Sequence, residues 1–157
     1  MASKVLESVP QSYFVIAGQG ELRNSLLELA GELGIADRVV FLGQVADVPG
    51  LLQRLQVGIL TSDSEGLSNS LVEYGLAGLP AVTFDVGGNA EVIQEGQTGF
   101  LVPPGDTVAM ADRVIQLLTD QGLHGEMSGK ARTHCALTFA PERIRNLTLD
   151  FFRSLID

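Results

Sequence analysis

Two glutamates and a glycine-containing turn form the segment of this sequence best suited to chemistry. Glu65 and Glu73 lie eight positions apart, and Gly66 belongs to a polar turn between them. A helix is expected to start at Ser68 or Asn69. Backbone N–H groups at a helix N-terminus are free and carry a partial positive charge, so they favour phosphate. Carboxylates on either side accept hydrogen bonds from hydroxyl groups. The segment therefore predicts a site for a phosphorylated, hydroxyl-rich ligand, built without a lysine.

The spacing of the two glutamates has a second interpretation. Glutamates eight positions apart are common by chance, and a capped surface helix with both carboxylates solvated near the helix dipole accounts for the same residues. The two interpretations differ in where the segment must lie in the fold. A binding site requires the segment to lie at the carboxyl ends of parallel strands, because ligands of open α/β sheets bind there.

The apolar pattern along the chain predicts such strands. Five short runs rich in β-branched residues each indicate a strand buried on both faces; they are residues 13–17, 38–42, 57–61, 81–84 and 100–102. Helical periodicity lies between and after them, in residues 21–33, 47–55, 68–79, 107–119, 124–137 and 141–155. This alternation predicts right-handed βαβ units. We expect one three-layer α/β domain over residues 1–157, a parallel sheet with helices on both faces and C-terminal helices over 107–157.

Composition limits the partners and the compartment. Nineteen acidic against ten basic side chains give a formal net charge of −9 and a pI near 4.6, which argues against a nucleic-acid groove and a polybasic membrane patch. The single cysteine, Cys135, allows no intramolecular disulfide and is expected to be a small core residue. Since the sequence has no signal-peptide pattern and no apolar run of membrane-spanning length, a cytoplasmic location is expected.

Other short motifs lack a residue that their chemistry needs. The turn at residues 18–20 follows a strand as a dinucleotide fingerprint would, but Arg23 occupies the third glycine position. Residues 129–130 lack the Ser or Thr that follows in a phosphate loop, and residues 66–70 lack the closing glycine of a hydrolase elbow. The two histidines have no acidic pair at ligand spacing, so a metal site is not expected.

Three blocks of sequence resemble one enzyme family. They are residues 65–80 (EGLSNSLVEYGLAGLP), 85–93 (DVGGNAEVI) and 96–106 (GQTGFLVPPGD). Together with residues 15–20 and 38–43 upstream, in the same order, they are similar to the C-terminal half of the retaining group 1 glycosyltransferases, which have the GT-B fold. The resemblance covers nearly all of the chain. It implies a Rossmann-like domain that binds a nucleotide sugar.

The resemblance also implies roles for single residues. Glu73 matches the carboxylate that binds the ribose hydroxyls, and Glu65 matches the catalytic carboxylate that meets the transferred sugar. The backbone groups that face the sugar and the diphosphate are implied to be those of Gly66, Leu67, Ser68 and Asn69. The turn that lies against the base is implied to comprise Gly43, Gln44 and Val45.

The reaction implied by the resemblance is the transfer of a hexose from a nucleoside-diphosphate sugar to a glycan or lipid acceptor, with retention of anomeric configuration. It implies neither a cofactor nor a bound metal, because the nucleotide sugar is itself a substrate. Peripheral membrane association of the full enzyme and a homo-oligomer are both compatible with it.

The sequence departs from the family in two respects. A complete enzyme has a second, N-terminal domain that supplies most of the acceptor site, which this chain would receive in cis or in trans. The family's C-terminal domain also begins with a strand and a loop whose Arg and Lys neutralise the diphosphate. This sequence starts in the following helix, and Lys4 does not match that loop. Two charge-assisted contacts, each worth about 1.5–3 kcal/mol, are therefore lost, and the chain alone is expected to lack a complete active site.

Two other functions stay open beside the donor-binding one. The chain could be an interaction subunit that completes a split glycosyltransferase, or a non-catalytic α/β scaffold whose glutamates serve no ligand. Co-purification with a second chain would favour the interaction subunit. The missing basic loop favours the non-catalytic scaffold.

The absent first strand also changes the expected sheet. Removing strand 1 from the doubly wound order 3-2-1-4-5-6 leaves an order that renumbers as 2-1-3-4-5, the flavodoxin-like order. We therefore expect the strand at 13–17 to pair directly with the strand at 57–61.

Overall fold

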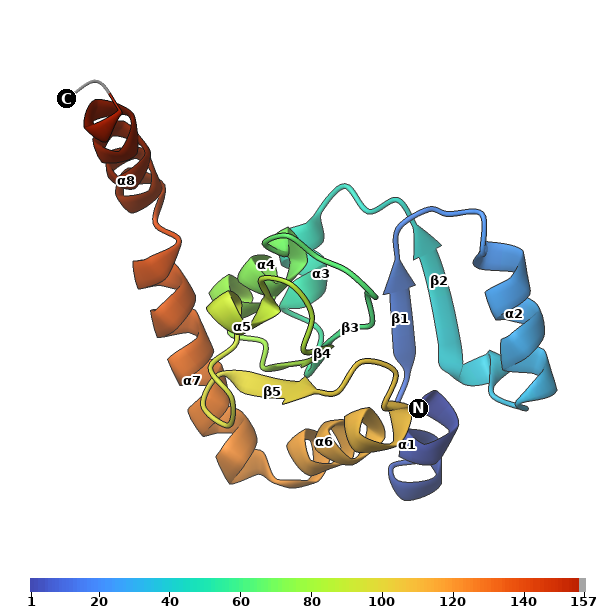
Figure 1. Cartoon of the computed structure of the whole chain (residues 1–157). Helices are drawn as coiled ribbons and strands as arrows, with labels where there is room; N and C mark the ends of the chain where they lie inside the picture. Colours follow the sequence, from blue (N-terminus) through green and yellow to red (C-terminus); the bar gives the residue numbers. More distant parts are fainter. Residues whose placement is uncertain (156–157) are drawn as a thin grey trace.

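The five expected strands all form, and each pairs in parallel with a neighbour. The computed structural model describes residues 1–155 (Figure 1). In it β1 (Phe14–Ala17) pairs with β2 (Val39–Gly43), and β4 (Ala81–Phe84) lies between β3 (Gly58–Leu60) and β5 (Gly99–Val102). All four residues of β4 are buried, as a strand covered on both faces requires. No residue of β1 or β2 is fully buried, so the expectation of burial on both faces is wrong for these two strands. The predicted α/β class with parallel strands is confirmed.

Helices connect and follow these strands, largely over the predicted ranges. They are α1 (Ala2–Ser8), α2 (Arg23–Glu32), α3 (Val48–Leu52), α4 (Asn69–Ala77), α5 (Asn89–Val92), α6 (Thr107–Thr119), α7 (Gln121–Thr138) and α8 (Pro141–Ser154), with the 3-10 helix η1 (Ala36–Arg38) before β2. α7 begins at Gln121 rather than at His124 because the carboxylate of Asp120 accepts a hydrogen bond from the N–H of Leu123 at 2.9 Å and caps the helix. α5 lies outside the predicted ranges because four residues are too few to show periodicity.

Two apolar cores lie on the two faces of β3–β4–β5. One joins Val5 of α1 and Met110 of α6 to residues of β4 and β5. The other joins Leu71 of α4, Val92 of α5 and Cys135 of α7 to the opposite face of β4. α1 and α6 therefore form one outer layer and α4 and α5 the other, with α7 contributing to both cores. This is the predicted three-layer arrangement.

The sheet is divided between β1 and β3. Among the described residues, β1 bonds only to β2, and β3 bonds only to β4. The predicted direct pairing of strands 13–17 and 57–61, and with it a continuous 2-1-3-4-5 sheet, is therefore wrong. Figure 1 shows the β1–β2 pair standing apart from β3–β5.

The helical layer explains why the gap stays open. α1 packs on α6, and Phe14 of β1 and Ile59 of β3 both pack against the core that contains Val5 of α1. Direct pairing of β1 with β3 would shift one half of the sheet against the packing of α1 on α6, and a close-packed layer resists such a shift.

The helices α2 and α8 leave most of their apolar side chains exposed. α2 buries only Ala30, and the leucines of its predicted apolar stripe, in α2 and at its two ends, are exposed. The two-stranded β1–β2 sheet offers this helix only a narrow surface. α8 buries no residue and extends away from the sheets (Figure 1). Within residues 1–155, no helix has both the length and the apolar character needed to cross a membrane.

Cys135 provides a chemical test of this packing. It is buried on α7, as predicted, and burial raises the pKa of its thiol to about 11. Because the thiolate is the reactive form, we expect a thiol reagent at mildly alkaline pH to modify the folded chain at least about 100-fold more slowly than the chain unfolded in urea. The rate is followed by the absorbance of the leaving group that the reagent releases when it reacts with the thiol. Equal rates in the two states would contradict the burial of Cys135 between α4 and α7.

Candidate functional site

The predicted glutamates lie around the N-terminus of α4, at the carboxyl end of β3. Glu65 is half-buried in the loop that joins β3 to α4, and Glu73 is exposed on the second turn of α4. Between them Gly66 and Leu67 are exposed, whereas Ser68 is buried. The structure therefore places this segment at the edge of the parallel strands where ligands of such sheets bind.

The N-terminus of α4 is uncapped. Ser68 makes no side-chain hydrogen bond to the helix. The N–H groups of Asn69, Ser70 and Leu71 have no hydrogen-bond partner among residues 1–155. By contrast, α3, α6 and α7 each carry an aspartate cap. Free N–H groups and the positive end of the helix dipole together suit an anionic oxygen, such as that of a phosphate.

Side chains of α7 form hydrogen bonds to the C-terminal end of α4. Gly78 ends α4 in the left-handed conformation, with φ +75°. The hydroxyl of Ser128 donates to the carbonyl of Gly78 at 2.6 Å, and the guanidinium of Arg132 donates to the carbonyl of Ala77 at 3.0 Å. These bonds satisfy carbonyls that a helix end leaves free. The helix that presents Glu73 is therefore held at the end opposite to the candidate site.

Tyr74 reports on the charge of its neighbour Glu73. Burial raises the pKa of the Tyr74 phenol above its usual value, and the adjacent carboxylate of Glu73 raises it further, since both disfavour the phenolate. In a Tyr13→Phe background, which leaves Tyr74 as the single tyrosine, we expect Glu73→Gln to lower this pKa. The measurement is an alkaline titration of near-ultraviolet absorbance. An unchanged midpoint would contradict the predicted proximity of the two side chains.

The turn at Gly43 follows the carboxyl end of β2, in the separate two-stranded sheet. Gly43 ends β2 with φ +65°, and its carbonyl accepts a hydrogen bond from the N–H of Gly18 at 2.7 Å. Val45 is half-buried and Gln44 is exposed. No hydrogen bond among residues 1–155 joins this turn to the loop that carries Glu65. The two parts of the predicted site thus each follow the carboxyl end of a strand and are joined by no hydrogen bond among the described residues.

The loop between β4 and α5 contacts the candidate site, although the sequence pattern assigns it no role. The N–H of Gly88 donates to the carbonyl of Gly66 at 2.8 Å. Two consecutive glycines in the loop that follows a strand are the sequence signal for such a close approach of backbones.

Lys4 is paired with an acidic side chain, and the described residues form no metal-ligand cluster. Lys4 forms an ion pair with Asp112 of α6, with 2.5 Å between Nζ and Oδ1. Within the described part of the chain, no three His, Cys, Asp or Glu side chains gather as a metal site would require. Metal independence stays a prediction from the family resemblance.

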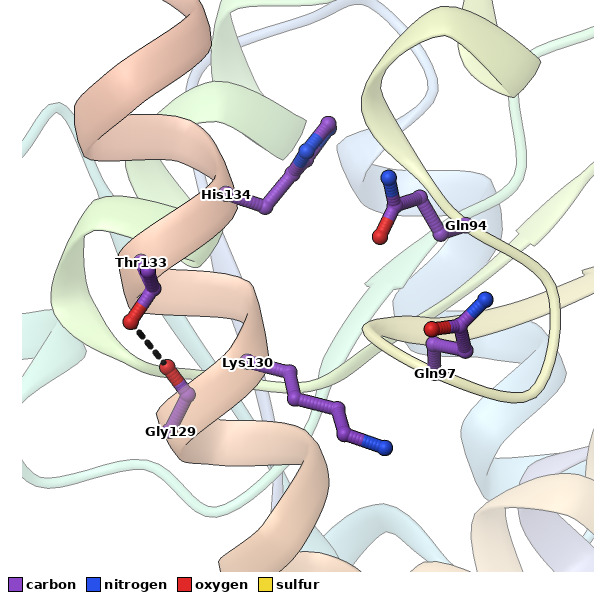
Figure 2. Close-up of a pocket in the computed structure, with 6 residues that line it drawn as sticks. All are labelled: Gln94, Gln97, Gly129, Lys130, Thr133 and His134. Atoms are coloured by element: carbon purple, nitrogen blue, oxygen red, sulfur yellow. Dashed lines mark hydrogen bonds between the residues drawn. The ribbon is translucent and has the colours of Figure 1, made fainter.

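A hollow of the surface lies away from the predicted residues. Figure 2 shows it between α7 and the loop that leads into β5, with a volume of about 390 Å³, and its lining residues are Gln94, Gln97, Gly129, Lys130, Thr133 and His134. Because this loop enters β5 at Gly99, the hollow borders the amino end of the strand. Parallel sheets bind ligands at the other edge, so we retain the α4 N-terminus as the candidate site.

Comparison with known proteins decides the family. The profile described as "Glycosyl transferases group 1" matches residues 1–120. The chain belongs to the group 1 glycosyltransferases. N-acetyl-alpha-D-glucosaminyl L-malate synthase of Bacillus anthracis is 39% identical over 130 residues, which are 83% of this chain and 34% of that protein. This group 1 glycosyltransferase chain therefore spans about a third of the length of that relative.

Solved structures have the same fold. HepE of Anabaena, solved in complex with UDP, is 25% identical, with a TM-score of 0.86 over 96% of this chain and 44% of HepE. The C-terminal domain of LpcC from Francisella tularensis is 20% identical, with a TM-score of 0.79 over 88% of this chain and 75% of that domain's chain. The α/β fold of this group 1 glycosyltransferase chain is that of the C-terminal, Rossmann-like domain of GT-B enzymes.

Proposed function

We propose that this chain is the donor-binding part of a retaining glycosyltransferase, which transfers a hexose from a nucleoside-diphosphate sugar to a glycan or lipid acceptor. The observation that carries the proposal is the uncapped N-terminus of α4, with Glu65 before it and Glu73 within it, at the carboxyl edge of parallel strands. The family membership and the UDP complex of HepE support it.

Each part of the site has a role in this proposal. The free N–H groups at the start of α4 bind the diphosphate, together with the backbone of residues 66–69. The carboxylate of Glu73 accepts hydrogen bonds from the ribose hydroxyls, and the carboxylate of Glu65 meets the transferred sugar. The turn from Gly43 to Val45 lies against the base. The nucleotide sugar is the substrate, and the proposal includes no cofactor.

The acceptor site comes from a second domain, supplied in cis or in trans. The proposal draws this from the family resemblance, and the short span of the chain relative to the Bacillus anthracis enzyme agrees with it. The chain by itself is then expected to bind a donor without completing the transfer.

Calorimetric titration of the chain with UDP, GDP and ADP, and with the corresponding nucleotide sugars, tests the proposal. We expect weak binding of one nucleotide, with a Kd of roughly 0.1–1 mM, or about −4 to −5.5 kcal/mol, because backbone N–H groups rather than a basic side chain hold the diphosphate in this proposal. The other nucleotides should bind less tightly. Flat titrations with every nucleotide at millimolar concentration would contradict a donor site in this chain and would favour a non-catalytic scaffold.

A second candidate is an interaction subunit that completes a split enzyme. It is favoured by the apolar side chains that α8 exposes, among them Ile144, Leu147 and Phe151. Exposed apolar patches commonly mark interfaces. The two candidates share the donor site and differ in whether the acceptor domain belongs to the same polypeptide. Purification of the tagged chain from its own cells distinguishes them, since only the second candidate predicts a separate partner polypeptide.

A further inference from the structure

The loop between β4 and α5 is built against the loop that carries Glu65. It comprises residues 85–88 and follows the central strand β4 at the carboxyl edge of the sheet. The N–H of Gly88 donates to the carbonyl of Gly66 at 2.8 Å. This bond joins two backbone segments that are separated by more than twenty residues and by α4.

Both glycines of this loop are required by the neighbouring backbone. A Cβ atom at Gly87 would overlap the carbonyl oxygen of Glu65, and one at Gly88 would overlap the carbonyl oxygen of Gly66. Gly87 also has φ +51°, which disfavours other residues. Gly88 has ordinary angles, φ −84° and ψ 10°. At Gly88, only the position of the Glu65–Gly66 backbone excludes a side chain.

The β4–α5 loop is itself anchored to the core by Asn89. This side chain is fully buried, and its amide nitrogen donates to the hydroxyl of Thr83 and to the carbonyl of Phe84, both at 3.0 Å. Thr83 is fully buried as well. Buried and bonded groups of this kind hold one conformation. The Glu65–Gly66 segment therefore rests on a fixed support rather than on a free loop.

We propose that Gly87 and Gly88 are positioning residues that set where the Glu65 carboxylate meets the transferred sugar. This inference rests on the proposed function, in which Glu65 contacts the sugar and Glu73 contacts the ribose. Glu65 precedes α4 and is held by the β4–α5 loop, whereas Glu73 is held by α4 and α7. A displacement of the Glu65–Gly66 segment thus affects the sugar end of the donor far more than its nucleoside end.

Gly88→Ala is the substitution that tests this. The new methyl group fits the backbone angles of residue 88 but forces the Gly66 carbonyl to move. We expect UDP-glucose to bind about tenfold or more weakly than to the wild-type chain, because a displaced carboxylate loses a charge-assisted hydrogen bond. Binding of UDP should change less than about threefold, because the remaining N–H groups of α4 and Glu73 stay in place. Gly125→Ala on α7, where a methyl group enters open space, is the matched control and should change neither affinity.

A double-variant cycle shows whether Gly88 acts through Glu65. Glu65→Gln alone should weaken UDP-glucose more than UDP, and Gly88→Ala should add little in that background, since both remove the same contact. Additive losses would mean that Gly88 acts by general destabilisation and would overturn the inference. Thermal unfolding confirms that each variant is folded.

The failures of the two proposals are distinguishable. A wild-type chain that binds none of UDP, GDP, ADP and their nucleotide sugars overturns the proposed function, and this inference with it. A wild-type chain that prefers UDP-glucose over UDP, together with a Gly88→Ala variant that keeps that preference, overturns the positioning role alone. A Glu65→Gln variant that binds UDP-glucose as tightly as the wild-type chain also overturns the positioning role, because Glu65 then contributes nothing to hold in place.

Discussion

Glu73→Gln is expected to weaken binding of UDP to this chain by roughly 10- to 100-fold, to below the range that calorimetry detects for an already weak ligand. The amide keeps the size of the side chain but removes the charge that strengthens hydrogen bonds from ribose hydroxyls. Glu73 is exposed at the candidate site, so the substitution should leave the fold intact. Titration of both chains at the same concentration measures the loss.

Glu28→Gln on α2 is the matched control for this prediction. Glu28 is also an exposed helical glutamate, and its replacement makes the same change in net charge. Any general repulsion between the acidic chain and the anionic nucleotide is therefore equal in the two variants. Equal affinities in Glu73→Gln and Glu28→Gln would show that Glu73 does not bind the nucleotide.

Leu71→Ala is expected to lower the free energy of unfolding by about 2–5 kcal/mol. Leu71 is fully buried where α4 packs on the sheet, in the same core as Val92 and Cys135. Its truncation removes apolar contacts and leaves a cavity in a layer that relaxes only partly. Because domains have only about 5–15 kcal/mol of stability, this loss is a large fraction of the total. It should lower Tm by roughly 4–20 °C.

Leu76→Ala gives the comparison on the same helix. Leu76 is 47% exposed, and its replacement makes the same change in helix propensity. We expect the loss of stability to be less than about 1 kcal/mol. Urea unfolding followed by circular dichroism gives both values. If the two variants lose equal stability, the packing of α4 against the sheet is not as the structure describes it.

Most of the local structure could be predicted because it depends on short patterns. The apolar run that ends at Phe84 forms β4 and is buried on both faces, as its lack of alternation indicates. Gly78 ends α4 in the left-handed conformation that glycine adopts readily. The position of Glu65 and Glu73 at the carboxyl end of β3 follows from the same patterns, because in a parallel sheet every strand-to-helix loop leaves at that edge.

The separation of β1 from β3 could not be predicted in this way. The expectation came from the strand order alone, whereas the structure keeps the strands apart because α1 packs on α6 beneath them. The exposed leucines around α2 have a related cause. Their spacing predicts a buried stripe, but burial needs a partner surface, and the two-stranded sheet beside α2 is narrow.

The sequence by itself determined the parallel α/β class, the two carboxylates and the helix start between them, because each depends on neighbouring residues. Only the tertiary structure decided that the sheet is divided, that Ser128 and Arg132 hold the end of α4, and that Gly88 bonds to Gly66. These features join segments far apart in the chain, and their geometry follows from how whole layers of side chains pack. No local pattern encodes that packing.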